Sequence, residues 1–250
     1  MNKIALIIAT LVLLAGITSC GLDRSKRPEA GPAPEIKMGE SHTFTLDNGL
    51  KVIVVENHKT PTISFQLTVD NDPILQKENA GYLEAAGNLM KTGTSNRTKQ
   101  DIDEALDFIG ARFYTGQNGF FGTTLTKFKD EFMEVMADVT LNPSFPQNEV
   151  DKYKKQTISG LATQENEANA MASNVAKMLR YGKNHPYGEV QTKETVANIT
   201  RDMCVNYYQT YFRPNVSYLT IVGDITTDDA KALAEKYFGN EPAYGKSVKT

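Results

Sequence analysis

The sequence predicts an α+β domain in which an antiparallel or mixed sheet is covered by helices on one face. Two observations point to this fold class. Segments with the two-residue period of strands come in clusters, and segments with the helical period lie between these clusters. Strand and helix do not alternate strictly, and no short repeat is present, so a regular parallel sheet of βαβ units is not expected.

The predicted strands are short segments that alternate apolar and polar side chains. The first two flank the turn Asp47-Asn48-Gly49, where Asn-Gly is a strong hairpin signal because both residues tolerate a positive φ. A later apolar run is closed by Gly223-Asp224 and predicts a buried strand. The predicted strands occupy residues 42–56 (two strands), 62–69, 111–115, 119–128 and 216–222.

The predicted helices carry apolar residues at spacings of three and four. The clearest spans residues 99–109, where Ile102, Leu106 and Ile109 share one face and Gly110 ends the helix. The other predicted helices occupy residues 78–94, 130–141, 147–181 with a break near 165–169, a short segment before residue 200, 200–212 and 227–238.

Residues 1–20 are predicted to be a lipoprotein signal peptide. Lys3 supplies the positive start, and Ile4–Ala15 is an apolar run too short for a membrane span of about 20 residues. The segment ends Ile17-Thr18-Ser19-Cys20, which resembles a bacterial lipobox and implies cleavage before Cys20 and a lipid on that cysteine. The alternative is a chance cysteine behind a plain signal peptide. We expect a lipid-anchored protein of the bacterial cell envelope, preferably in the outer membrane. The sequence does not predict whether it faces the periplasm or the cell surface.

Three further parts are expected after the signal peptide. Residues 21–40 are rich in Gly, Pro and charge and predict a flexible tether, residues 41–240 predict one domain, and residues 241–250 predict a linker towards a second half. The formal net charge of −3 argues against a nucleic-acid partner. Cys204 is expected to be a small buried hydrophobe, because no histidine stands with it in a recognisable Cys/His pattern.

Four segments, in the same order, resemble the insulinase, pitrilysin and mitochondrial processing peptidase family. They are FTLDNGLKVIVVENH, the region ending MKTGTSNRT, LNPSFPQNEVDKYK, and the stretch from NHPYG to TIVGDI. The last is the most specific, since it combines His-Pro-x-Gly, a helix, Arg213-Pro214-Asn215 and a strand ending in Gly-Asp. The resemblance covers about residues 42–240 and implies one α+β lobe of a pair that closes around an unfolded peptide.

The family's zinc helix carries His-x-x-Glu-His before an apolar pair and Gly-Thr. The matching segment is ENAGYLEAAGNLMKTGT, residues 78–94. Aligned on Gly93-Thr94, the resemblance places Glu84 and Asn88 at the two histidines and Gly87 at the catalytic glutamate. An amide is a poor zinc ligand and a glycine cannot accept a proton, so the resemblance implies a degenerate site.

The family's third zinc ligand, a glutamate on a later helix, falls on Gly160, with Ser159 as the second choice. We therefore expect no catalytic residue, no cofactor and no metal in this segment. Residues 78–94 are then an ordinary amphipathic helix with Leu83, Ala86 and Met90 towards the core. Zinc is expected in an active partner or in a missing half.

The favoured interpretation is a non-catalytic, membrane-anchored lobe of an insulinase-type zinc peptidase, paired as a heterodimer or with a second homologous half. It shapes the chamber and binds unfolded peptide beside an active zinc-bearing subunit. Phe113-Tyr114 and Phe120-Phe121 are candidates to line that chamber, or else core residues of a hairpin. One alternative is an active zinc metalloendopeptidase with its metal site beyond residue 250. Another is a membrane-tethered peptide-binding or scaffold protein.

Overall fold

The computed structural model describes residues 31–32 and 39–240. The chain divides into two compact units, Met1–Met38 and Gly39–Thr250, and every helix and strand described belongs to the second. The predicted signal peptide, Cys20 and the linker at 241–250 lie outside the described residues, as does most of the tether. In the described part of the chain, no helix combines the length and the apolar character needed to cross a membrane.

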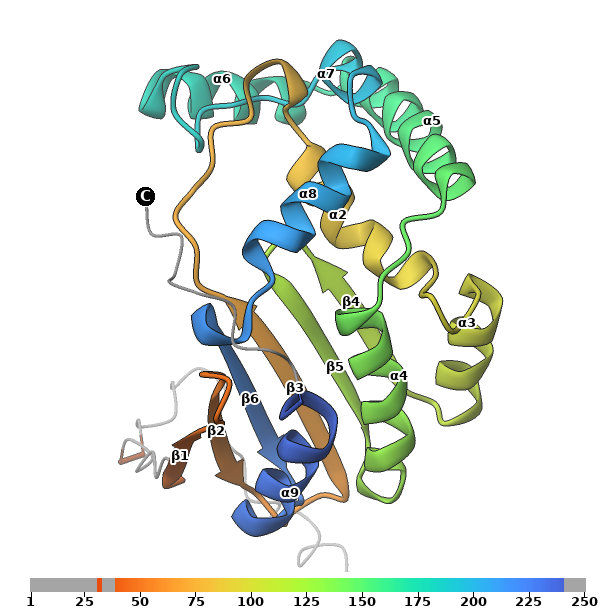
Figure 1. The fold of residues 1–250 in the computed structure, drawn as a ribbon. Coiled ribbons are helices and arrows are strands. Elements are labelled where there is room, and N and C mark those ends of the chain that lie inside the picture. Colours follow the sequence, from red (N-terminus) through yellow and green to blue (C-terminus); the bar gives the residue numbers. More distant parts are fainter. Residues whose placement is uncertain (1–30, 33–38, 241–250) are drawn as a thin grey trace, which may run out of the picture. The chain divides into compact units, whose positions relative to one another are not determined.

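The second unit is built on a six-stranded sheet with the strand order β1-β2-β6-β3-β5-β4 (Figure 1). β2 and β6 run parallel, and all other neighbouring strands are antiparallel. The predicted α+β class is therefore confirmed, with a mixed sheet. The strands are β1 (Ser41–Thr45), β2 (Lys51–Glu56), β3 (Thr62–Val69), β4 (Arg112–Gly116), β5 (Gly119–Leu125) and β6 (Ser217–Gly223).

The last strand of the chain, β6, lies in the middle of the sheet between β2 and β3. Val54 of β2 is opposite Ile221 of β6, which is opposite Phe65 of β3, and all three side chains are buried. Its apolar pattern predicts β6 as a buried strand, but the pattern does not name its neighbours. Only the fold shows that β6 joins the N-terminal hairpin to the rest of the sheet.

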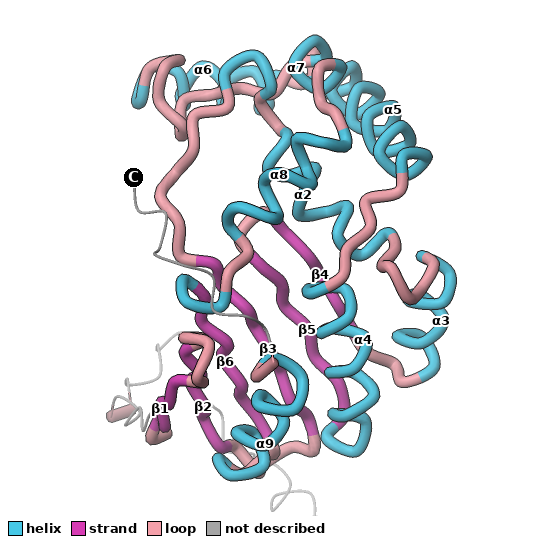
Figure 2. Tube along the Cα trace, viewed as in Figure 1, coloured by secondary structure: helices cyan, strands magenta, loops and turns pink. Residues whose placement is uncertain are grey.

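Helices cover one face of the sheet (Figure 2). In β3 the side chains of Ile63, Phe65 and Leu67 are buried, and the residues between them are exposed or half-buried. The helices are α2 (Tyr82–Leu89), α3 (Lys99–Phe108), α4 (Lys129–Leu141), α5 (Gln147–Gln164), α6 (Ala168–Tyr181), α7 (Lys193–Ala197), α8 (Arg201–Tyr211) and α9 (Thr227–Phe238). The predicted break near residues 165–169 is confirmed as the junction of α5 and α6.

The single helix predicted over residues 78–94 is wrong in detail. A 3₁₀ turn over Lys77–Asn79 precedes α2, and a second one over Met90–Thr92 follows it. The first break is at Gly81, whose φ of +104° lies in the left-handed region that favours glycine. The predicted strand over residues 119–128 is also too long, because its last three residues form a 3₁₀ turn.

The β1–β2 turn uses its two signal residues differently from the prediction. Gly49 has a φ of +90°, but Asn48 is not among the described residues with positive φ. The buried Asn48 side chain instead makes two hydrogen bonds. Its Nδ2 donates to the carbonyl of Phe238 at 2.6 Å, and its Oδ1 accepts from the N–H of Leu50 at 3.1 Å. The turn is thereby tied to the C-terminal end of α9.

Four phenylalanines form the core between the sheet and α4. The ring of Phe132 stacks on Phe65 at 5.6 Å between centroids and meets the edge of Phe113 at 5.9 Å, while Phe120 packs on Phe113. Gly122 of β5 makes room for this cluster, since a Cβ there would lie 2.2 Å from the Phe132 ring. The core therefore depends on the absence of a side chain at one strand position.

The polar turn after α2 is tied to α4 by the buried carboxylate of Asp138. This carboxylate accepts hydrogen bonds from Thr94 (2.7 Å), Asn96 (2.6 Å), Arg97 (2.9 Å) and Asn142 (2.9 Å). Burial alone would raise the pKa of Asp138, but these hydrogen bonds outweigh burial and hold the pKa below its usual value.

Asp138→Asn is expected to lower the free energy of unfolding by about 2–3 kcal/mol at neutral pH, because Arg97 loses a buried charged partner. Since the folded-state pKa is depressed, the contribution is present above the unfolded-state pKa of about 4 and is lost as pH falls through the folded-state pKa. Urea unfolding at pH 7 and near pH 3 should show the difference from wild type shrinking. The exposed Asp107→Asn is the control, and a difference that is independent of pH would contradict the prediction.

Candidate functional site

The first three predicted site positions lie on α2. The helix begins where the side-chain oxygen of Gln76 accepts hydrogen bonds from the N–H groups of Gly81 (2.9 Å) and Leu83 (3.3 Å). Within α2 the Glu84 side chain is exposed and Asn88 is half-buried. The backbone therefore holds these two side chains four residues apart on one face, at the spacing that a two-ligand metal site on a helix requires.

Gly87 lies between them and is buried against the turn that joins β4 to β5. A Cβ built on Gly87 would lie 2.1 Å from the carbonyl carbon of Gly116 and 2.3 Å from the nitrogen of Gln117. These are backbone atoms, so a side chain at residue 87 requires the turn to move. The resemblance placed Gly87 at the position of the family's catalytic glutamate, and it did not predict that the packing at residue 87 requires glycine.

The turn facing Gly87 is held in place from α8. The hydroxyl of Tyr207 donates a hydrogen bond to the carbonyl of Gln117 at 2.8 Å. Burial raises the pKa of this phenol well above its usual value, so the group stays a neutral donor. Cys204 on the same helix is a fully buried free thiol whose pKa burial raises to about 11, which confirms the prediction of a small buried hydrophobe.

Tyr153 of α5 interacts with both Glu84 and Asn88 of α2. Burial raises the pKa of its phenol, the negative charge of Glu84 raises it further, and a hydrogen bond with Asn88 acts in the opposite direction. Tyr153 therefore lies near both Glu84 and Asn88. The sequence prediction missed Tyr153, although its spacing from the buried Val150 on the same helix was a usable signal.

Gly160, the predicted third position, lies about two helical turns beyond Tyr153 on α5. It is exposed, as is its alternative Ser159, and a Cβ on Gly160 would have no atom within 4 Å. A longer side chain has room at residue 160 but not at residue 87. The donors at the four predicted positions are one carboxylate and one amide, a set that does not fit the His- and Cys-based coordination of zinc.

A polar cavity of about 260 Å³ opens beside Glu84. It is bounded by α2, α5, α6 and the connector before α7, and its lining includes the carboxamides of Gln76, Gln117, Gln164, Asn174 and Gln191. The Nε2 of Gln191 is buried without a partner among the described residues. Glu189 is already used, because it accepts hydrogen bonds from the N–H of Gln76 at 2.8 and 3.0 Å. The cavity offers amide donors and acceptors.

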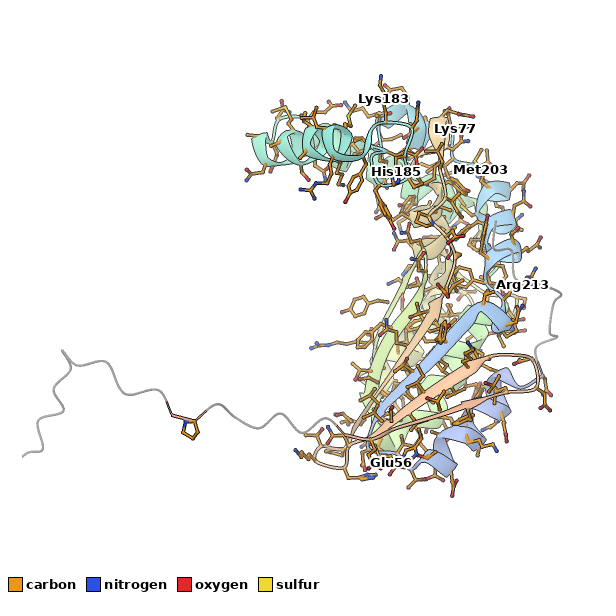
Figure 3. The ribbon with its side chains drawn as sticks, turned by 90° about the vertical axis from the view of Figure 1, so that its left-hand side faces the viewer. Glu56, Lys77, Lys183, His185, Met203 and Arg213 are labelled. Carbon is orange, nitrogen blue, oxygen red and sulfur yellow. The ribbon has the colours of Figure 1, made fainter. Side chains whose placement is uncertain are left out.

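None of the three described histidines, His42, His58 and His185, lines this cavity. His185 and Glu56 lie at opposite ends of the unit (Figure 3). His185 belongs to an exposed ring cluster at the end of α6, where it stacks on Tyr181. His58 lies between two carboxylates, with Nδ1 2.8 Å from Asp224 and Nε2 3.4 Å from Glu56. The hydrogen bonds with Asp224 and then Glu56 raise the pKa of His58, and both ring nitrogens are occupied. Across the described ranges, no three His, Cys, Asp or Glu residues are grouped as metal ligands.

The aromatic pairs of the β4–β5 hairpin divide between the two predicted roles. Phe113 and Phe120 are buried in the core, as one reading predicted. Tyr114 and Phe121 are opposite each other in the register, on the face of the sheet away from the helices, and their exposed fractions are 57% and 42%. The strand period of two separates neighbours in each pair, so the hairpin contributes one ring of each pair to the core and one to the open face.

Comparison with known proteins relates the chain to one peptidase family. The family described as "Peptidase M16 inactive domain" matches residues 198–249. The chain is 23% identical to the Bacillus subtilis protein named "Uncharacterized zinc protease YmxG" over 212 residues, covering 82% of this chain and 51% of that protein. It is 22% identical to the beta subunit of the rat mitochondrial-processing peptidase, covering 88% of this chain and 46% of the relative. The chain thus spans about half the length of these curated relatives.

Solved structures share the fold. A Pseudomonas fluorescens peptidase M16 inactive domain has a TM-score of 0.73 at 20% identity and is aligned over 83% of this chain and 53% of its own. The periplasmic protease PqqL from Escherichia coli has a TM-score of 0.69 at 20% identity and is aligned over 87% of this chain and 25% of its own. The chain is thus similar in sequence to M16 peptidases, and it shares the fold of solved M16 lobes, including one described as an inactive domain.

Proposed function

We propose that this chain is a non-catalytic lobe of an M16-type zinc peptidase, which shapes a chamber and binds peptide beside an active, zinc-bearing lobe. The observation that carries the proposal is the contact between Gly87 and the β4–β5 turn. The backbone of the β4–β5 turn occupies the space that a side chain at residue 87 would need. A glutamate at this position would therefore require the turn to move as well as the residue to change. The relatives named as zinc proteases supply the reaction class.

The open face of the sheet supports a role in peptide binding. β4 is an edge strand, and an edge strand offers unpaired backbone groups to an extended peptide. Tyr114 of β4 and Phe121 of β5 form an exposed aromatic pair, and the ammonium group of Lys91 lies 6.0 Å from the centre of the Tyr114 ring. Aromatic side chains next to a free edge favour extended peptides with apolar residues. Attachment to the envelope through a lipid on Cys20 stays part of the proposal.

Gly87→Ala is expected to lower the free energy of unfolding by about 1–3 kcal/mol, because the methyl group meets the backbone of Gly116 and Gln117. Gly160→Ala is the matched control on α5, since its Cβ has open space. That control should be neutral or stabilising by up to about 1 kcal/mol, because alanine restricts the unfolded chain. Urea unfolding of both variants measures the contrast, and equal stability of the two would remove the steric argument.

Rebuilding the family motif is expected to fail at residue 87. The double variant Glu84→His/Asn88→His should fold and bind Zn²⁺ through two imidazoles, without cleaving peptide. Adding Gly87→Glu should unfold or strongly destabilise the protein, because the longer side chain displaces the β4–β5 turn. Circular dichroism and zinc titration follow both variants. A triple variant that folds and cleaves peptide with zinc would contradict this prediction, because the β4–β5 turn would then accommodate a side chain at residue 87.

The direct test compares the full-length protein alone with the same protein mixed with an M16 protein from the same cell that carries an intact His-x-x-Glu-His. No zinc and no peptide cleavage alone, with cleavage on mixing, is the expected result. Stoichiometric zinc and cleavage by the protein alone would instead place an active site in sequence beyond residue 250. That outcome is the second candidate function, favoured by the fact that this chain spans about half of relatives named as zinc proteases.

A further inference from the structure

Among the described residues, α6 carries several exposed large apolar side chains. Met171, Val175 and Met178 are spaced by four and three residues, and Leu179 is four residues from Val175; the exposed fractions of Met171, Val175, Met178 and Leu179 are 50, 54, 40 and 82%. A stripe with this period marks the face of a helix that packs on another surface. We call these four residues the α6 stripe.

α6 has no buried side chain along its 14 residues. Among the helices and strands described, none packs extensively on it. A helix of this length is marginal in water, and most helices are stabilised by packing of an apolar face. Within residues 39–240, the α6 stripe is therefore an apolar face on which no other element packs extensively.

An aromatic cluster continues the stripe at the end of α6. Tyr181 stacks on His185 at 5.5 Å between ring centres, and Tyr187 lies 5.6 Å from Tyr181 and 5.4 Å from His185. The loop that carries these rings is closed tightly, because a Cβ on Gly188 would lie 1.9 Å from the carbonyl oxygen of Gly182. Exposed aromatic rings held in a fixed arrangement are typical anchors of protein interfaces.

The charge of this region has one sign. Residues 168–188 contain Lys177, Arg180 and Lys183 and no aspartate or glutamate, although the whole chain has a net charge of −3. A partner that covers the α6 stripe is therefore expected to be apolar at its centre and acidic at its rim. The polar side of α6 is already in use, since Asn174 and Lys177 line the cavity beside Glu84.

We propose that the α6 stripe and the aromatic cluster form the docking surface for a second M16-type lobe with an apolar, acid-rimmed face. This inference rests on the proposed function. Two observations favour such a partner. The chain spans about half the length of its curated relatives, and α6 projects on the side of the open sheet face, away from the helices that cover the sheet (Figure 3).

The second lobe has two possible sources, a further part of the same polypeptide or a separate subunit. An anionic membrane is the competing occupant, because a basic amphipathic helix also suits a lipid surface. The test places the photo-crosslinker benzoylphenylalanine at Leu179 in the full-length protein inside its own cell. Phe108 is the control position, since it is 86% exposed on α3, outside the α6 stripe.

After irradiation, mass spectrometry identifies what is joined to residue 179. Adducts with an M16-homologous lobe, within the polypeptide or on a second one, support the proposal and distinguish the two sources. Val175→Asp should then lower the adduct yield at least tenfold, whereas Phe108→Asp should leave it unchanged. Adducts with lipid, with an unrelated protein or with a second copy of α6 would overturn the proposal, as would the absence of any adduct.

The cross-linking result is separable from the test of the proposed function. Adducts with a homologous lobe whose peptide cleavage does not require this chain would uphold the docking surface and refute the silent-lobe function. Cleavage that appears only on mixing, without any adduct from residue 179, would uphold the function and place the lobe contact on another surface.

Discussion

The contact between Gly87 and the β4–β5 turn sets the position of α2, and the helices above the sheet depend on that position. α2 packs on α5, α8 and β4, so it connects the upper helices to the sheet. The phenol of Tyr207 holds the same turn from α8. Glycine at residue 87 thus lets α2 and the turn pack closely, with α8 held to the same turn.

Local sequence patterns predicted the elements of this fold well. The strand over residues 62–69 and the helix over residues 227–238 have the predicted bounds, because their periods are strong and their ends carry turn or capping residues. The break at Gly81 was missed because an isolated glycine inside a helical pattern is often tolerated. The place of β6 in the sheet was not predictable, since hydrophobic alternation records burial and not which strand lies alongside.

The candidate site was predictable only in part for a similar reason. The positions Glu84, Gly87 and Asn88 follow from the family resemblance, aligned on Gly93-Thr94. Tyr153, which faces Glu84 and Asn88, comes from a helix far away in sequence, and the backbone that approaches Gly87 belongs to a hairpin turn. Contacts of this kind depend on tertiary packing. The same holds for α6, whose amphipathic pattern predicts a buried face that the described chain leaves open.

The central place of β6 has a consequence for the order in which the protein folds. Strands β2 and β3 are near neighbours along the chain but are separated in the sheet by residues 217–223. When the chain is made from its N-terminus, the sheet cannot be completed until β6, near the end of the domain, has been synthesised. Contacts between residues so far apart in sequence slow folding. Until then, β2 of the N-terminal hairpin keeps an unpaired edge, whose free backbone groups are open to pairing with other chains.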